Sequence, residues 1–195
     1  MKYSILYITT ILLLSSCSYQ NIKINLLPES NSSAKEQDSS FREIQIIDNR
    51  KNKLLIGTKQ LGTKTIEITS TQNLKPLIKS KIIKYLKDSN LSITKKIELK
   101  IYIEKLSYHS KRGFIVGKSN LQIRLKASVL QNNNIKFNKT YNITKAQAHF
   151  VSSSKKSDQK IISSTLELII NNIIANKELS NIWVKTGNFR LQTNT

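Results

Sequence analysis

Residues 97–104, with the sequence IELKIYIE, decide the fold of this chain. Their isoleucine and leucine residues alternate with polar or charged ones, and the same period of two returns in residues 121–129, LQIRLKASV. This alternation is typical of a strand that packs one face on a core and turns the other to water. The two segments therefore predict two long strands of one antiparallel or mixed sheet.

Shorter strand patterns precede these two segments. Residues 44–47 and 54–58 flank a turn-rich cluster at 48–52, so we expect them to form a hairpin. Residues 65–69 place isoleucines on one side and predict a third short strand.

Another strand follows the triple asparagine at 132–134, because asparagine tolerates the left-handed backbone of a tight turn. The apolar residues of this strand keep one parity from Ile135 to Ile143, and Phe150 has the other. Such a change of phase predicts a bulge or a bend between them.

Two segments have helical periodicity. Residues 74–86 form an apolar stripe at steps of three and four, with Asn73 as the expected N-cap and Pro76 in the first turn. This stripe suits packing on a sheet, and a basic membrane-surface helix is the alternative. From Ser157, the expected N-cap, a second stripe runs to about residue 176, and Trp183 and Val184 are expected to close the core. The residues expected on the face of that second helix are Ile162, Leu166, Ile169, Ile170, Ile173 and Ile174.

The order of these elements predicts an α+β domain. We expect a two-layer sandwich, with a mostly antiparallel or mixed sheet and two helices on one face. The folded domain is predicted to span 43–186, followed by a flexible C-terminal tail at 187–195.

The N-terminal residues are typical of a lipoprotein signal peptide. Lys2 precedes an apolar run of about ten residues, and a stable membrane helix needs ~20. Residues 14–17, Leu-Ser-Ser-Cys, resemble the bacterial lipobox, in which the thiol accepts diacylglycerol and the peptidase cleaves before the cysteine. We expect a signal peptide at 1–16, and an acylated Cys17 with a polar tether at 17–42. An ordinary secretory signal that contains a cysteine is the alternative.

The predicted location follows from the residue after the cysteine. Enteric lipoproteins that stay in the inner membrane have Asp at that position, and this chain has Ser18. The resemblance implies an outer-membrane protein that is anchored by its acyl chains and faces the periplasm.

The order of motifs resembles the YajG family of probable outer-membrane lipoproteins of gamma-proteobacteria. The resemblance rests on the lipobox, the helix entry at 69–74, the strands at 99–106 and 118–129, and the final isoleucine-rich helix before residues 182–184. The family has no assigned activity, so the resemblance implies a cellular location and a fold but no catalysed reaction. This chain departs from the family in being strongly basic.

Charge is the main feature of the composition. The 195 residues hold 32 Lys+Arg against 12 Asp+Glu, a formal charge of +20, and 38% apolar residues with a single Cys. These values exclude a disordered tail and a disulfide scaffold. If the two long strands pair, Lys100, Arg124 and Lys126 share the face turned away from the helices and form a possible anionic-ligand face with Tyr102.

The ligand of such a face stays open at this stage. Lipid A phosphates, acidic glycans or the carboxylates of an envelope protein all suit it, and a solvated surface set by genome composition is the plain alternative. We expect no nucleic acid as a partner, because exported proteins seldom meet it. A basic nucleic-acid-binding protein becomes the alternative if the signal peptide is misread.

Catalytic patterns are absent from the sequence. His109 and His149 lie far apart with no H-E-x-x-H spacing, and there is no G-x-S-x-G, P-loop or G-x-G-x-x-G motif. We therefore expect no enzyme, no metal and no cofactor. The predicted function is a binding or structural role in the envelope, with lipid or lipopolysaccharide handling as one alternative and an unrecognised hydrolase as another.

Overall fold

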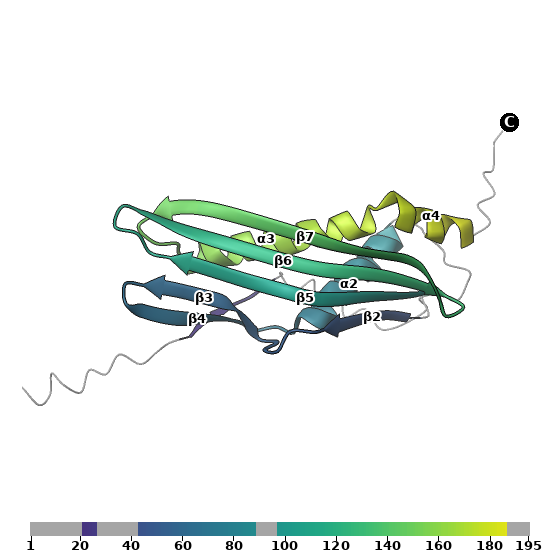
Figure 1. Cartoon of the computed structure of the whole chain (residues 1–195), viewed down its shortest axis with the longest axis horizontal. Coiled ribbons are helices and arrows are strands. Elements are labelled where there is room, and N and C mark those ends of the chain that lie inside the picture. Colours follow the sequence, from purple (N-terminus) through teal and green to yellow (C-terminus); the bar gives the residue numbers. More distant parts are fainter. Residues whose placement is uncertain (1–20, 27–42, 89–96, 187–195) are drawn as a thin grey trace, which may run out of the picture.

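The computed structural model describes residues 21–26, 43–88 and 97–186. These residues form one seven-stranded mixed sheet with helices packed against it, so the predicted α+β class is confirmed (Figure 1). The strands are β1 (Ile22–Ile24), β2 (Glu43–Asp48), β3 (Leu55–Leu61), β4 (Lys64–Ser70), β5 (Ile97–Lys111), β6 (Val116–Gln131) and β7 (Asn134–Phe150). The helices are α2 (Leu74–Asp88), α3 (Lys155–Ile174) and α4 (Lys177–Thr186).

The long strands β5, β6 and β7 form an antiparallel meander of 15, 16 and 17 residues. The two segments with the clearest alternation pair as expected, with Leu99 opposite Val129 and Ile101 opposite Ala127. One end of the meander holds the β5–β6 connection and the last residue of β7, and the other holds the β6–β7 turn (Figure 1). We call the first, residues 112–116 with Phe150, the Phe114 end, and the second, residues 131–135, the Asn133 end.

The core lies between the sheet and α2 and α3, which run behind the sheet in Figure 1. The apolar stripe of α2 is buried at Leu74, Ile78, Ile82 and Leu86, which confirms packing on the domain for these residues. All the apolar residues predicted on the face of α3 are buried too. Burial of one such side chain stabilises the fold by roughly 1.5–3 kcal/mol, so these stripes decide where the helices lie.

The helix starts agree with the sequence for one helix and differ for the other. Asn73 caps α2 as expected, because its Oδ1 accepts the N–H of Lys75 at 3.0 Å. Helix α3 starts three residues earlier than predicted, and its N-cap is Ser154, whose Oγ accepts the N–H of Ser157. Several serines precede this helix, and sequence alone does not separate their cap potential. Trp183 lies in α4, and its side chain falls outside the described part of the chain.

Strands β2 and β3 do not form the expected hairpin. Each pairs with β5 in parallel on the same edge, β2 from Glu98 to Ile103 and β3 from Tyr108 to Lys111. A strand as long as β5 has room for two short partners placed end to end. The connecting turn therefore carries the chain forward along β5 instead of reversing it.

The segment expected to be a tether contains a strand. Residues Ile22–Ile24 form β1, which pairs in parallel with β4, and Ile24 and Leu26 are fully buried. The folded domain thus includes residues before the predicted start at 43, because two apolar side chains in a polar stretch suffice for a short edge strand. The signal peptide, Cys17 and the tail at 187–195 lie outside the described residues.

Strand β7 has no bulge where its pattern changes phase. Its pairing with β6 is continuous from Phe137 to Phe150, and Phe150 is opposite Val116. Phe150 therefore points to the face away from the helices and is 80% exposed. The change of phase marks an apolar side chain on the outside of the sheet, not a break in the strand.

Candidate functional site

The cations predicted for a binding face share the side of the sheet turned away from α2 and α3. Tyr102 is opposite Lys126, and the ammonium of Lys126 lies 6.0 Å from the centre of the Tyr102 ring. Lys100 is paired with Glu98 at 3.0 Å, whereas Arg124 is exposed. We call this side of β5, β6 and β7 the outer face. Its further cations are Lys105, Lys111 and Lys118.

The two histidines lie on opposite sides of the sheet. His109 is exposed on the outer face, and its Nδ1 lies 2.9 Å from the hydroxyl of Thr58. His149 faces the helix side, and its Nε2 lies 3.0 Å from the hydroxyl of Ser119. Each ring is thus bonded to a neighbouring strand. Among residues 21–26, 43–88 and 97–186, no three His, Cys, Asp or Glu side chains gather as metal ligands.

A buried polar cluster lies on the helix side of the Phe114 end. Asp158, in the first turn of α3, accepts a hydrogen bond from the Lys59 ammonium at 3.0 Å and one from the Tyr108 hydroxyl at 2.5 Å. Lys59 also donates to the carbonyl oxygen of Ser153. All three side chains of the Asp158 contacts are at least nine-tenths buried, and the helix dipole favours a carboxylate at this place.

The electrostatics of this cluster favour a structural role. Burial raises the pKa of Tyr108 to about 12, and the hydrogen bond to the Asp158 carboxylate adds to the rise. The phenol is therefore a firm hydrogen-bond donor at neutral pH. Because Lys59 of β3 and Tyr108 of β5 bond the two oxygens of Asp158, the cluster ties β3, β5 and α3 together.

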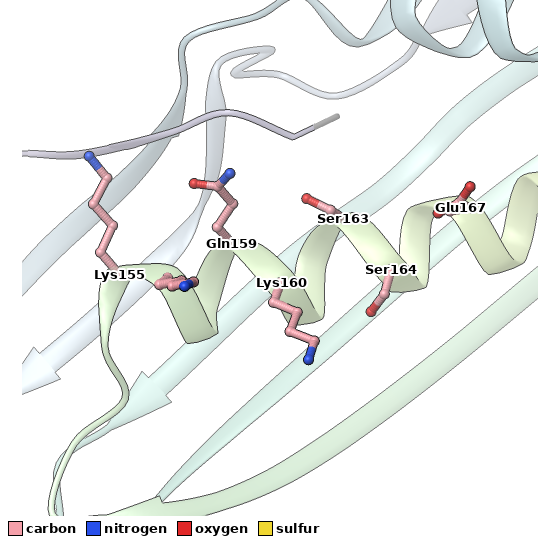
Figure 2. A pocket seen from close by; sticks show the side chains of 7 residues that line it. Lys155, Gln159, Lys160, Ser163, Ser164 and Glu167 are labelled. Carbon is pink, nitrogen blue, oxygen red and sulfur yellow. The ribbon is translucent and has the colours of Figure 1, made fainter. Parts of the chain in front are cut away.

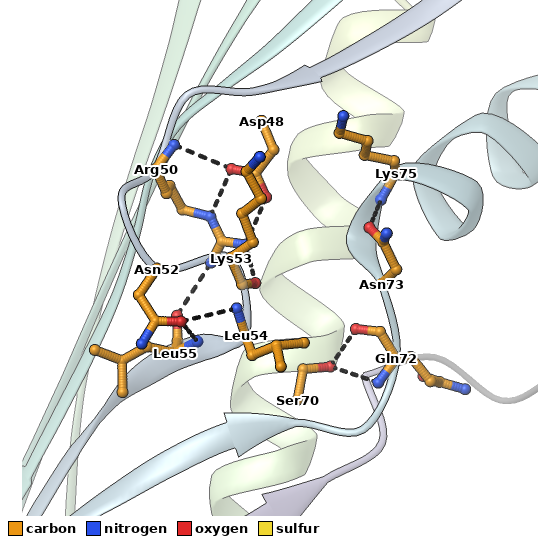
Figure 3. Close-up of polar contacts among 10 residues, drawn as sticks. All are labelled: Asp48, Arg50, Asn52, Lys53, Leu54, Leu55, Ser70, Gln72, Asn73 and Lys75. Carbon is orange, nitrogen blue, oxygen red and sulfur yellow. Dashed lines mark hydrogen bonds and ion pairs between the residues drawn. The ribbon is translucent and has the colours of Figure 1, made fainter.

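A second polar group shapes the turn between β2 and β3 (Figure 3). Arg50 bonds both carboxylate oxygens of Asp48, at 2.9 and 2.8 Å, and donates to the carbonyl oxygens of Lys53 and Leu55. Burial alone would raise the pKa of Asp48, but the hydrogen bonds and charge of Arg50 lower it overall. A shallow pocket of about 700 Å³ lies between this turn and β5. The guanidinium is engaged by its own turn, so it does not serve as a binding group for a ligand there.

Another shallow pocket, of about 630 Å³, runs along α3. Figure 2 shows side chains of Lys155, Gln159 and Ser163 around it, and Glu167 at its far end is bonded to Lys81 of α2 at 2.5 Å. The residues that line it are all polar or charged, and all of them lie on one helix. It therefore lacks the convergent groups from several elements that a built ligand site has.

Sequence reasoning missed the buried cluster, because a charged residue in a strand is read as exposed. The outer face was found because alternation places its cations on one side. Cys17, the predicted lipidation site, lies outside the described residues. None of the helices in the described ranges is long and apolar enough to cross a membrane.

Comparisons with known proteins agree with the sequence resemblance. The family model described as "Uncharacterized lipoprotein" matches residues 28–183. The crystal structure of protein XCC0632 from Xanthomonas campestris, of family DUF330, shares the fold with a TM-score of 0.52 at 11% identity, covering 86% of this chain and 97% of that one.

A minor lipoprotein from Acinetobacter baumannii aligns with a TM-score of 0.36 at 10% identity, over 71% of this chain and 97% of its own. No curated protein matches the sequence. The family match covers most of the chain, so the resemblance to a lipoprotein family is confirmed. This chain belongs to the family of uncharacterized lipoproteins.

Proposed function

We propose that this protein is anchored to the outer membrane by acyl chains on Cys17 and that its two-layer α+β domain binds an acidic envelope partner in the periplasm. The observation that carries the proposal is the outer face of β5, β6 and β7. No helix of the described ranges covers this face, and Arg124 and Lys126 stand on it beside Tyr102.

The charge distribution supports a partner that supplies carboxylates or phosphates. The sequence from Lys105 to Ser157 contains no Asp or Glu, although it builds most of the outer face. Lys105 lies directly opposite Arg124, and like charges in this position destabilise a sheet. An anionic partner relieves this repulsion, and the positive electrostatic potential of the face attracts it.

Binding of a surface partner is favoured over lipid handling because side chains fill the space between the helices and the sheet. A module that carries a lipid needs an apolar groove between helix and sheet, and here that interface is occupied by buried isoleucine and leucine side chains. The pockets along α3 and beside Arg50 are shallow and have polar side chains in their walls. We therefore favour a partner that docks on the surface over a ligand held inside the domain.

The anchor is tested by membrane fractionation of cells that make the wild type or Cys17→Ala. We expect the wild type in the outer membrane with an acylated Cys17 in the intact mass of the N-terminal peptide, and the variant released from it. An unlipidated chain that begins at Met1 and stays in the cytoplasm contradicts the proposal.

The binding face is tested by site-specific photocrosslinking in cells. A crosslinker at Gln122, on the outer face between the cations, is compared with one at Lys160 on the exposed side of α3. We expect a discrete product from Gln122 that disappears when Arg124→Glu and Lys126→Glu are added. A product that survives this charge reversal, or that forms equally at Lys160, contradicts binding at the outer face.

A further inference from the structure

The Phe114 end exposes apolar side chains that folding does not require. Phe114 is 97% exposed, Ile115 62%, Val116 53% and Phe150 80%. They meet at one place, because residues 114–115 form the loop before β6 and Val116 is opposite Phe150. We call these four residues the apolar tip. Such a contiguous apolar surface marks a site of contact with a partner or a membrane.

The apolar tip is held in one shape by the backbone around it. The N–H of Gly113 bonds the carbonyl oxygen of Val151 at 3.0 Å, and the N–H of Val151 bonds that of Ile115 at 2.9 Å. Val151 adopts a φ of 57°, which a β-branched residue rarely does. A Cβ at Gly113 would lie 1.8 Å from the carbonyl oxygen of Val116, so only glycine fits there. These contacts fix the backbone conformation in which the loop exposes its apolar side chains.

Three cations lie next to the apolar tip. Lys111 and Lys118 are directly opposite each other just below it, and the exposed Arg112 follows Lys111. Two like charges in register are unfavourable unless an anion lies nearby. Exposed apolar side chains next to lysine and arginine are typical of a segment that enters the headgroup layer of an anionic bilayer.

The sheet register relates the apolar tip to the predicted lipid anchor. Residues that lie opposite one another form a row across the sheet from β1 to β6. Along this row, Ile22 of β1 is followed by Ile68 of β4, Gly57 of β3, Tyr108 of β5 and Leu121 of β6. Strand β1 runs parallel to β4, β4 runs antiparallel to β3, and β3 runs parallel to β5. Ile22 is therefore the end of β1 that lies nearer to the Phe114 end. Cys17 precedes Ile22 by five residues, a reach of at most about 18 Å. Val116 precedes Leu121 by five residues along β6, which places it about 17 Å nearer to the Phe114 end.

We propose that the apolar tip inserts into the headgroup region of an anionic lipid bilayer beside the acylated Cys17. The inference rests on the proposed lipid anchor and adds a second, non-covalent contact with the same membrane. An anchor that reaches only to the level of the tip keeps this end of the domain at the bilayer. The long strands then project away from it, and the outer face stays open to a partner.

The test uses the full, lipidated protein in vesicles of phosphatidylethanolamine and phosphatidylglycerol with brominated acyl chains. Cys17 carries the lipid, so a cysteine introduced by Phe114→Cys is the one thiol free for an environment-sensitive fluorophore. Asn134→Cys, exposed at the Asn133 end, carries the same fluorophore as the matched control. We expect a blue shift and strong quenching at position 114, and neither at position 134.

A second pair of samples separates the protein's contact from that of the dye. Adding Ile115→Ser and Phe150→Ser to the Phe114→Cys protein is expected to abolish most of the quenching while the urea midpoint stays unchanged. If mass spectrometry shows that Cys17 is acylated but the fluorophore at position 114 is not quenched, the membrane contact of the tip is overturned while the proposed anchor stands. The tip is then a protein-docking surface. An unacylated Cys17 overturns the proposed anchor, and the inference falls with it.

Discussion

At the Asn133 end, the turn between β6 and β7 consists of asparagines, and the side chains beneath it on the helix side, Val129 and Phe137, are buried and apolar. At the Phe114 end, the exposed loop is apolar, and the buried side chains beneath it are Lys59, Asp158 and Tyr108. Folding alone explains the first arrangement, because a tight turn needs left-handed residues and a core needs apolar ones. It does not explain the second, where Phe114, Ile115, Val116 and Phe150 are exposed together, whereas the Asn133 end exposes Ile135 alone among its large apolar residues; for the Phe114 end we propose the membrane contact.

The largest expected effect lies in the buried cluster of the Phe114 end. Asp158→Ala leaves the Lys59 ammonium buried without its carboxylate, and we expect a loss of about 3–5 kcal/mol of unfolding free energy. Urea denaturation followed by circular dichroism measures it.

A double variant serves as the control for this prediction. Lys59→Met with Asp158→Leu removes both charges, and we expect it to recover most of the loss. If Asp158→Ala changes stability by less than about 1 kcal/mol, the cluster does not hold β3, β5 and α3 together.

The same cluster predicts sensitivity to alkali. The pKa of Tyr108 is raised from its ordinary value of 10.0 to about 12 in the folded state, so the unfolded chain loses this proton first. The stabilisation is fully present below pH 10 and is lost as the pH rises through about 12. We expect Tyr108→Phe to be less stable at pH 8 but to have a shallower decline in that window, measured by urea unfolding at each pH. An equal decline in both proteins would place the alkaline transition elsewhere.

A smaller effect is expected in the turn of the Asn133 end. Asn133 has a φ of 62°, and a β-branched residue there costs roughly 1–2 kcal/mol. Asn133→Val should therefore lower stability, whereas Asn134→Val, at the first residue of β7, should not. Thermal melts of the two variants measure this difference. Equal melting temperatures would contradict the claim that the left-handed backbone of this turn requires asparagine at position 133.

The smallest effect on stability is expected at the apolar tip. Phe114 makes almost no contact with the domain, so Phe114→Asn should change the unfolding free energy by less than about 0.5 kcal/mol. The same change should weaken contact of the tip with anionic vesicles. The acyl chains keep the protein on the vesicles in either case, so the contact is measured in the acylated protein as the slowing of hydrogen exchange at residues 115 and 116 on vesicles, which the variant should lose. A large loss of stability with unchanged slowing at these residues would reverse the comparison between the two ends.

Periodicity predicted the parts of the fold that bury one continuous face. The alternation in β5 and β6 and the stripes of α2 and α3 appear in the structure because burial imposes a period on the sequence. The parallel pairing of β2 and β3 with β5 depends on contacts between distant segments, which no local pattern records. Strand β1 is too short to show a period.

The site was less predictable than the fold. Alternation found the shared face of Arg124 and Lys126, but nothing marked Lys59 and Asp158 as a buried pair. The apolar tip did leave a signal, since three consecutive apolar residues lie between Gly113 and Gly117 where a hairpin loop is usually polar.

The most direct test of the central claim is hydrogen exchange of the intact acylated protein, free in detergent and bound to anionic vesicles, followed by mass spectrometry. We predict slower exchange on vesicles for the backbone amides of residues 113–116 and unchanged exchange for residues 132–135. Equal rates in both states at 113–116, with Cys17 acylated, would contradict a membrane contact at the Phe114 end.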